Sequence, residues 1–253
     1  DPVFRLPFLA GLLLAGVLPV LGVLLMLRDE WLAALGLAHL AAAGALLGIA
    51  LGIPALFGAG LGACAGGMAK SLTGIRGNGA YAFMILIGWS GLMLVAANAP
   101  GGEALGYALI DGQLYFAGWP ELTAALLLVL AAAIALPRLM PRLLHARFFP
   151  QHEGANRLPA WRWHVGFDLL VALGLAVATA TLGVMGAFVL ILLPAWAAFR
   201  VAPSWGWTLG ISALLGITAY GGAFVLALGL DQPFGPILVV VCLGLGGLVG
   251  RFA

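Results

Sequence analysis

The chain has 253 residues, of which 64% are hydrophobic and only 8% are charged. A soluble domain carries roughly 25% charged residues, so this composition excludes a water-soluble globular protein and indicates a chain that crosses a membrane many times. The net charge of +2 is small, so the placement of the charges along the chain is more informative than their sum.

Long apolar runs separated by short polar breaks predict nine membrane-spanning helices. A helix needs about 20 apolar residues to cross a hydrocarbon core of roughly 30 Å, and runs such as LTAALLLVLAAAIAL do not alternate as the strands of a barrel do. The expected spans are 8–27, 31–51, 55–69, 80–97, 121–136, 165–182, 187–199, 205–228 and 237–249. The predicted fold class is therefore all-α: a polytopic helical bundle of about eight or nine transmembrane helices, forming one transmembrane domain over residues 1–253. The spans 165–182 and 187–199 are short, and one bent element is the alternative for them.

Residues 137–164 form the one long polar segment of the chain, PRLMPRLLHARFFPQHEGANRLPAWRWH, and hold five of the eleven basic residues. Basic loops between apolar spans stay in the cytoplasm. With the N-terminus outside, only Arg5 lies on the outer side, and the inner side holds the other ten basic residues: Arg28, Lys70, Arg76, Arg138, Arg142, Arg147, Arg157, Arg162, Arg200 and Arg251. This bias predicts an outside N-terminus, a cytoplasmic C-terminus and a cytoplasmic loop over 137–164, which is the largest surface for a cytoplasmic partner. A basic loop that only anchors the chain at the membrane is the alternative.

His39 is the only histidine within a predicted span. An ionisable side chain in the membrane is costly and is a functional candidate by default, and neutral imidazole is a common ligand of first-row divalent metals. A histidine that only hydrogen-bonds to a neighbouring helix is the alternative. Asp168 lies near the start of its span, where we expect it to cap the helix or to pair with Arg162 or His164.

Motifs of soluble enzymes do not occur in the sequence. There is no GxxxxGK[ST] phosphate-binding loop and no GxSxG or HExxH motif. We therefore expect no enzyme activity and no cofactor bound by this chain, so that any ATP would be bound and hydrolysed by a separate chain. The basic residues are juxtamembrane, which gives no support to nucleic-acid binding. Cys64 and Cys242 lie in apolar runs without a CxxC pattern and are expected as buried thiols.

Four segments, in order over nearly the whole length, carry a family resemblance. They are FRLPFLAGLLLAGVLPVLGVLLMLR (4–28), LGLAHLAAAGALLG (35–48), DGQLYFAGWPEL (111–122) and GVMGAFVLILLPAWAAFRVAP (183–203). Together they resemble the permease subunits of bacterial metal-type ABC importers, the zinc, manganese and iron family.

This resemblance implies a multi-pass permease in the bacterial inner membrane that moves a divalent transition-metal ion by alternating access. It implies as partners a cytoplasmic ABC ATPase, an extracytoplasmic solute-binding protein, and a second permease copy or a paralogue, all within membrane lipid. His39 stands at the histidine of the family's metal-site helix. The family's ATPase-coupling helix falls in the polar segment, at Arg147, Phe148, Phe149, Pro150, Gln151, His152, Glu153 and Arg157.

The sequence departs from the family pattern at three places. Leu35 stands where the family has an aspartate four residues before its histidine, Asn78 stands where it has an acidic residue, and 148–158 departs from the usual coupling segment. A different substrate, a differently built site, or one half of a heteromeric pore would each account for these departures. The rival functions are an ATP-independent secondary transporter with His39 as a proton relay and a non-transporting membrane assembly subunit. An intramembrane enzyme has the least support.

Overall fold

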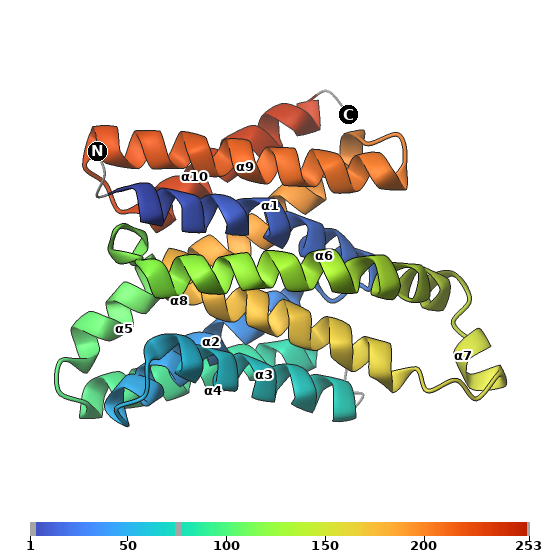
Figure 1. Ribbon diagram of the computed structural model, residues 1–253, viewed down its shortest axis with the longest axis horizontal. Helices are drawn as coiled ribbons and strands as arrows, with labels where there is room; N and C mark the ends of the chain where they lie inside the picture. The colour runs from blue at the N-terminus through green and yellow to red at the C-terminus, as the bar shows by residue number, and fades with distance from the viewer. Residues whose placement is uncertain (1–3, 74–76, 252–253) are drawn as a thin grey trace.

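A computed structural model describes residues 4–73 and 77–251, so the predicted inner-side residue Arg76 lies outside the described residues. These residues form helices joined by short turns, with no strand among them (Figure 1). The helices are α1 (Arg5–Leu27), α2 (Trp31–Ala50), α3 (Ala55–Thr73), α4 (Asn78–Asn98), α5 (Gly102–Asp111), η2 (Leu114–Phe116), α6 (Trp119–Phe148), α7 (His152–Ala155), α8 (Trp161–Val201), α9 (Trp205–Leu230) and α10 (Phe234–Arg251). The predicted all-α class is confirmed. Six of these helices, α1, α2, α4, α6, α8 and α9, are long and apolar enough to cross a membrane, and α10 contains a shorter apolar helix over Phe234–Val249.

Helix α8 consists of two antiparallel arms that meet at Gly183. A straight helix of its 41 residues would be about 62 Å long, twice the hydrocarbon core of a bilayer. Gly183 has φ 79° and ψ 170°, a conformation that essentially only glycine adopts. On either side of this turn, Gly174 packs on Leu21 while Ile191 packs on Gly22, so both arms lie against the same level of α1. The predicted spans 165–182 and 187–199 are therefore two separate passes, here called the first arm (161–182) and the second arm (184–201).

Replacing Gly183 by alanine is expected to lower the amount of monodisperse protein in detergent several-fold. A Cβ atom at this position would lie 2.5 Å from the Gly112 nitrogen and 2.5 Å from the Ile110 carbonyl oxygen, and the backbone conformation adds strain of about 1–3 kcal/mol. Gly60→Ala is the matched control, because a Cβ there meets nothing within 4 Å. Size-exclusion yield and thermal midpoint test this prediction, and equal midpoints for the two variants would contradict it.

Helix α6 continues twelve residues beyond its predicted end. The predicted break at Pro137 is wrong, because the helix runs through Pro137 and Pro141 to Phe148. Each proline removes one N–H donor, and membrane helices tolerate this loss where other groups satisfy the freed carbonyls. Nearby, the Arg138 guanidinium donates to the Ile134 carbonyl at 2.6 Å. With 30 residues α6 is about 45 Å long, so it projects beyond a 30 Å core.

The polar segment 137–164 is correspondingly a mostly helical structure and not an open loop. It comprises the last turns of α6, the short helix α7 and the first turn of α8. The stretch between α4 and α6, which lies between the predicted spans 80–97 and 121–136, likewise contains α5 and η2. Both stretches contain proline and glycine residues, which commonly interrupt long helices. Their short helices pack against the main bundle or project from it.

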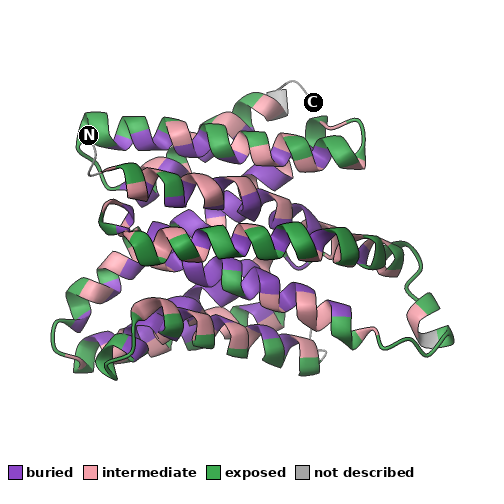
Figure 2. Cartoon of the chain, viewed as in Figure 1, coloured by how far each residue is buried: buried purple, intermediate pink, exposed green. Residues whose placement is uncertain are grey.

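The core of the bundle is made by α8, α1 and α2. In the most apolar window of each helix, 78% of residues are buried in α8, 67% in α1 and 61% in α2, against 22% in α4 and in α6 (Figure 2). The outer helices expose large apolar side chains such as Phe57, Phe83 and Leu127. Such exposed side chains suit a protein surrounded by lipid.

The connections between helices gather at two opposite ends of the bundle (Figure 1). The α7 end holds the connection 28–30, α7 and the connection 202–204. The α5 end holds the connection 51–54, α5 and η2. Helix α1 begins at the α5 end and α10 ends at the α7 end, so these helices start and finish on opposite ends of the bundle. Because the basic residues concentrate at the α7 end, the charge bias predicts that this end faces the cytoplasm.

Candidate functional site

His39 lies deep in the bundle, on a helix held by glycine contacts on two sides. Gly44 of α2 packs on Gly58 and Gly62 of α3, and Gly88 of α4 packs directly on the His39 backbone. Small residues at such crossings let membrane helices approach closely. His39 is the ninth residue of α2 and lies about 13 Å from the helix start, near the middle of a 30 Å core.

The His39 side chain is 6% exposed and keeps one ring nitrogen for other partners. Its Nδ1 atom lies 2.9 Å from the Leu35 carbonyl oxygen, and its ring packs edge-on against Trp89 with centroids 5.9 Å apart. In the tautomer that satisfies the first contact, Nδ1–H donates to Leu35 and Nε2 keeps its lone pair. The hydrogen bond of His39 is thus made within α2, whereas the alternative from the sequence was a bond to a neighbouring helix. Nε2 has the form of a metal-binding or proton-accepting imidazole.

The described residues do not form a complete metal site around His39. Among residues 4–73 and 77–251, no group of three or more His, Cys, Asp or Glu side chains could hold a metal ion. Leu35, one turn before His39, contributes an apolar side chain at the position where the family resemblance implies an aspartate. Of these two side chains, only that of His39 offers a donor atom.

At the α7 end, the predicted coupling residues form a projecting and mostly exposed structure. Arg147 and Phe148 close α6, Phe149, Pro150 and Gln151 form the turn, and His152 and Glu153 lie in α7. Phe148 is 68% exposed and Phe149 is 59% exposed, although both are large apolar side chains. Arg157 follows in a left-handed conformation with φ 50°. Exposed aromatic residues beside arginine are typical of the anchors at protein–protein contacts.

Helix α7 is tied to the first turn of α8 by Glu153. Its carboxylate accepts from Trp163 Nε1 at 2.8 Å and lies 3.2 Å from His164 Nε2. On the other side, the Arg142 guanidinium of α6 stacks on the Trp163 ring, 4.7 Å from its centroid. The last turns of α6, helix α7 and the start of α8 are thereby linked to one another by side-chain contacts.

Four charged side chains form a buried ion-pair cluster at the same end: Arg28, Glu30, Lys70 and Asp168. Arg28 lies 2.8 Å from Glu30 and 3.2 Å from Asp168, and Lys70 lies 2.7 Å from Glu30 and 2.8 Å from Asp168. Their side chains are only 2–7% exposed. Ser71 also donates to Asp168, and Arg28 lies over the Phe167 ring at 5.1 Å. Among the residues that the structure describes, two cations here face two carboxylates, and buried charges are tolerated when they are paired in this way.

The prediction that Asp168 caps its helix or pairs with Arg162 or His164 is wrong. Helix α8 begins at Trp161, so Asp168 lies in its second turn and faces α1 and α3 instead. The sequence reasoning also missed Glu30 as a site residue. A signal was present, because Arg28, Glu30, Lys70 and Asp168 all fall near inner ends of predicted spans and carry balanced charges.

The α5 end is closed by aromatic packing. Tyr115 of η2 packs edge-on against Phe4, with ring centroids 5.8 Å apart, and in a tilted arrangement against Phe224, with centroids 6.0 Å apart. Burial raises the pKa of the Tyr115 hydroxyl, and the negative charge of Asp231 raises it further. The hydroxyl stays neutral at physiological pH, so this cluster adds no charge to the α5 end.

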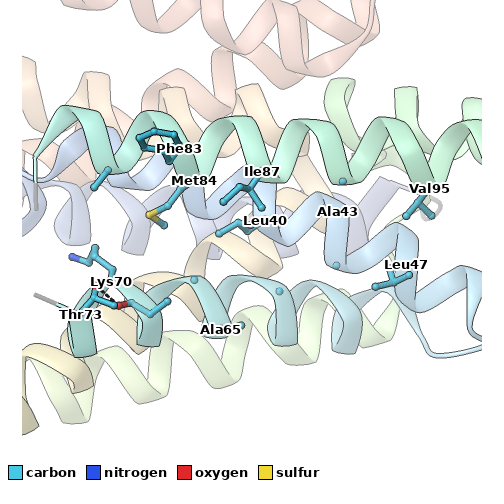
Figure 3. A pocket seen from close by; sticks show the side chains of 16 residues that line it. Leu40, Ala43, Leu47, Ala65, Lys70, Thr73, Phe83, Met84, Ile87 and Val95 are labelled. Carbon is cyan, nitrogen blue, oxygen red and sulfur yellow. Dashed lines mark hydrogen bonds between the residues drawn. The ribbon is translucent and has the colours of Figure 1, made fainter. Parts of the chain in front are cut away.

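A groove of about 700 Å³ runs between α2, α3 and α4 (Figure 3). Lys70 and Thr73 line one end of it, and Leu47 and Val95 line the other. The wall between them is made of apolar and small residues, including Leu40, next to His39. This groove offers no set of ligands for an ion, and it suits lipid chains or another apolar helix.

An antiparallel bundle of apolar helices, with a cationic projection at one end, is the architecture of a multi-pass membrane protein. The family model of the ABC 3 transport family matches residues 2–247, and the chain belongs to this family of transport permeases. This finding confirms the resemblance to permease subunits of metal-type ABC importers, and it makes the chain a transport permease subunit.

Solved structures share the fold. PsaBC from Streptococcus pneumoniae in complex with Fab is similar with a TM-score of 0.84 and 17% identity, over 98% of this chain and 91% of that chain. A protein assigned to the metal-chelate type of ABC transporter, in an inward-facing conformation, is similar with a TM-score of 0.72 and 20% identity, over 98% of this chain and 85% of that chain. No curated protein sequence matches this chain.

Proposed function

We propose that this chain is the transmembrane subunit of an ABC importer for a divalent transition-metal ion, namely zinc, manganese or iron. The family match over residues 2–247 is the observation that carries this proposal. The similar fold of a transporter assigned to the metal-chelate type supports the substrate class. His39 supports it independently, because it places a ligand that such ions favour near the middle of the membrane.

The proposed assembly places the α7 end in the cytoplasm of a bacterium and the α5 end outside the inner membrane. A cytoplasmic ABC ATPase binds the structure around α7, and ATP is bound by that partner. An extracytoplasmic solute-binding protein delivers the ion to the α5 end. Charge bias supports this orientation, since Arg142, Arg147, Arg157 and Arg162 lie around α7 while Arg5 lies at the opposite end.

A second permease chain completes the metal site in this proposal. One imidazole is a weak ligand set, and Leu35 has no oxygen donor at the position where the family has a carboxylate. A second copy would bring a second His39, and a paralogue would bring a carboxylate of its own. Closure of the ATPases would then move α7 and switch the helices around His39 between outward-open and inward-open states.

Purification of the tagged chain from its native membrane, followed by uptake assays in proteoliposomes, tests this function. We expect an ABC ATPase to co-purify and the complex to import zinc, manganese or iron(II) only when ATP is supplied on the cytoplasmic side. Uptake by the chain without an ATPase would favour a secondary transporter. Undiminished metal uptake in cells that lack the chain would instead favour an assembly subunit.

A further inference from the structure

The ion-pair cluster holds three parts of the bundle together at the α7 end. Asp168 belongs to the first arm of α8, Lys70 to α3, and Arg28 with Glu30 to the connection between α1 and α2. Each cation contacts both carboxylates, at distances of 2.7–3.2 Å. The first arm of α8 therefore cannot shift along α1 and α3 without an exchange of ionic partners inside the protein.

One side of the ion-pair cluster leads to α7. Glu153 of α7 contacts Trp163 and His164 in the first turn of α8, and Asp168 follows on the same helix, about one turn further on. A displacement of α7 along the membrane normal would thus be carried into α8 by hydrogen-bonded contacts and by a continuous helix.

The other side of the ion-pair cluster leads to His39. Glu30 directly precedes α2, and His39 is the ninth residue of that helix. Gly88 of α4 and Gly44 of α2 lie at close backbone contacts that pack α2 against α4 and α3. The path from α7 to His39 therefore consists of two helices joined by the ion-pair cluster.

Stability alone does not account for four buried charges at this position. Well-packed apolar residues can often replace a buried ion-pair network without loss of stability, because the charges must be removed from water. Charged side chains, unlike apolar ones, can have different specific partners in two arrangements of the helices. A structural element that switches between two states requires such alternative contacts.

We propose that the ion-pair cluster couples movement of α7 to movement of α2, with Asp168 as its positioning residue. In this role Asp168, which contacts both Arg28 and Lys70 in this structure, keeps only one of these contacts as the first arm of α8 shifts, and Glu30 transfers the shift to the helix that carries His39. This inference rests on the proposed function, because α7 must be the part that an ATPase moves.

Two charge-balanced double variants test the coupling role. Lys70→Met with Asp168→Asn leaves the Arg28–Glu30 pair and disconnects α8. Arg28→Gln with Glu30→Gln leaves the Lys70–Asp168 pair and disconnects α2. Arg200→Gln is the matched control, because this guanidinium at the end of α8 stacks on Trp196 at 4.0 Å and lies outside the ion-pair cluster.

The measurement is the number of metal ions imported per ATP hydrolysed by the reconstituted complex of permease and ATPase. The probe is whichever of zinc, manganese and iron(II) the wild-type complex imports. We expect both double variants to assemble and to hydrolyse ATP within about twofold of the wild type, while ions imported per ATP fall at least about tenfold. Asp168→Glu, which keeps the charge, is expected to retain most of the coupling, as is Arg200→Gln.

Two results would overturn the inference. One is an unchanged ratio of ions to ATP in either double variant. The other is a parallel loss of inserted protein, ATP hydrolysis and import in both, which would make the ion-pair cluster a structural contact only. Failure of the wild-type complex to import any of the three metals with ATP is a different result, because it would contradict the proposed function itself.

Discussion

Replacing Phe148 and Phe149 together by alanine is expected to abolish co-purification of the ATPase while leaving the chain folded in the membrane. These aromatic side chains are 68% and 59% exposed at the tip of the α7 end, so their removal takes little from the core. Aromatic anchors at interfaces contribute about 2 kcal/mol or more each, so even one anchor corresponds to roughly thirtyfold in Kd. Quantitative pull-down of the ATPase at fixed permease concentration measures this loss.

Phe116→Ala is the control for the ATPase contact. Phe116 is 86% exposed but lies in η2, at the opposite end of the bundle. We expect this variant to bind the ATPase as the wild type does. Full ATPase binding by the Phe148 and Phe149 double variant would show that the ATPase contact lies outside the segment around α7.

His39→Ala is expected to lower metal uptake at least about tenfold without changing the amount of inserted protein. The variant removes an imidazole whose hydrogen bond is made within its own helix, to the Leu35 carbonyl, and it leaves the glycine contacts of α2 intact. The folded bundle therefore loses little, whereas the transported ion loses its nitrogen ligand near the middle of the membrane. Uptake rate per inserted permease in proteoliposomes measures the effect.

Ser212→Ala is a matched control for His39→Ala, because Ser212 is also buried and its hydroxyl donates within its own helix, to Leu209 at 2.8 Å. We expect its uptake to stay within about twofold of the wild type. Equal uptake by the His39 and Ser212 variants would show that the His39 side chain has no role in transport.

The helical spans could be predicted from the sequence because each depends on a local property, the length of an apolar run. The expected breaks after Leu27, at Gly52 and Pro54, and at Gly183 all occur in the structure. Pro137 misled the prediction, since proline commonly ends a helix, whereas α6 runs through Pro137 and Pro141 to Phe148.

The ion-pair cluster could not be predicted from local sequence patterns, because its members come from three separate helical regions. Asp168 has basic neighbours at Arg162 and His164 in the sequence, and local reasoning chose them. The structure places Lys70, far away in the sequence, 2.8 Å from its carboxylate instead. Helix packing decides such pairings, as it also decides that His39 faces Trp89.

Cross-linking of α7 to the ATPase tests the central claim most directly. In a chain with Cys64 and Cys242 replaced by alanine, a single cysteine is introduced by Gln151→Cys, next to α7. After treatment of inside-out membrane vesicles with a bifunctional maleimide, we predict that this cysteine cross-links to the ABC ATPase, whereas a cysteine introduced by Phe116→Cys does not. Modification of Gln151→Cys by an impermeant reagent from outside the cell, with no ATPase adduct, would contradict the account.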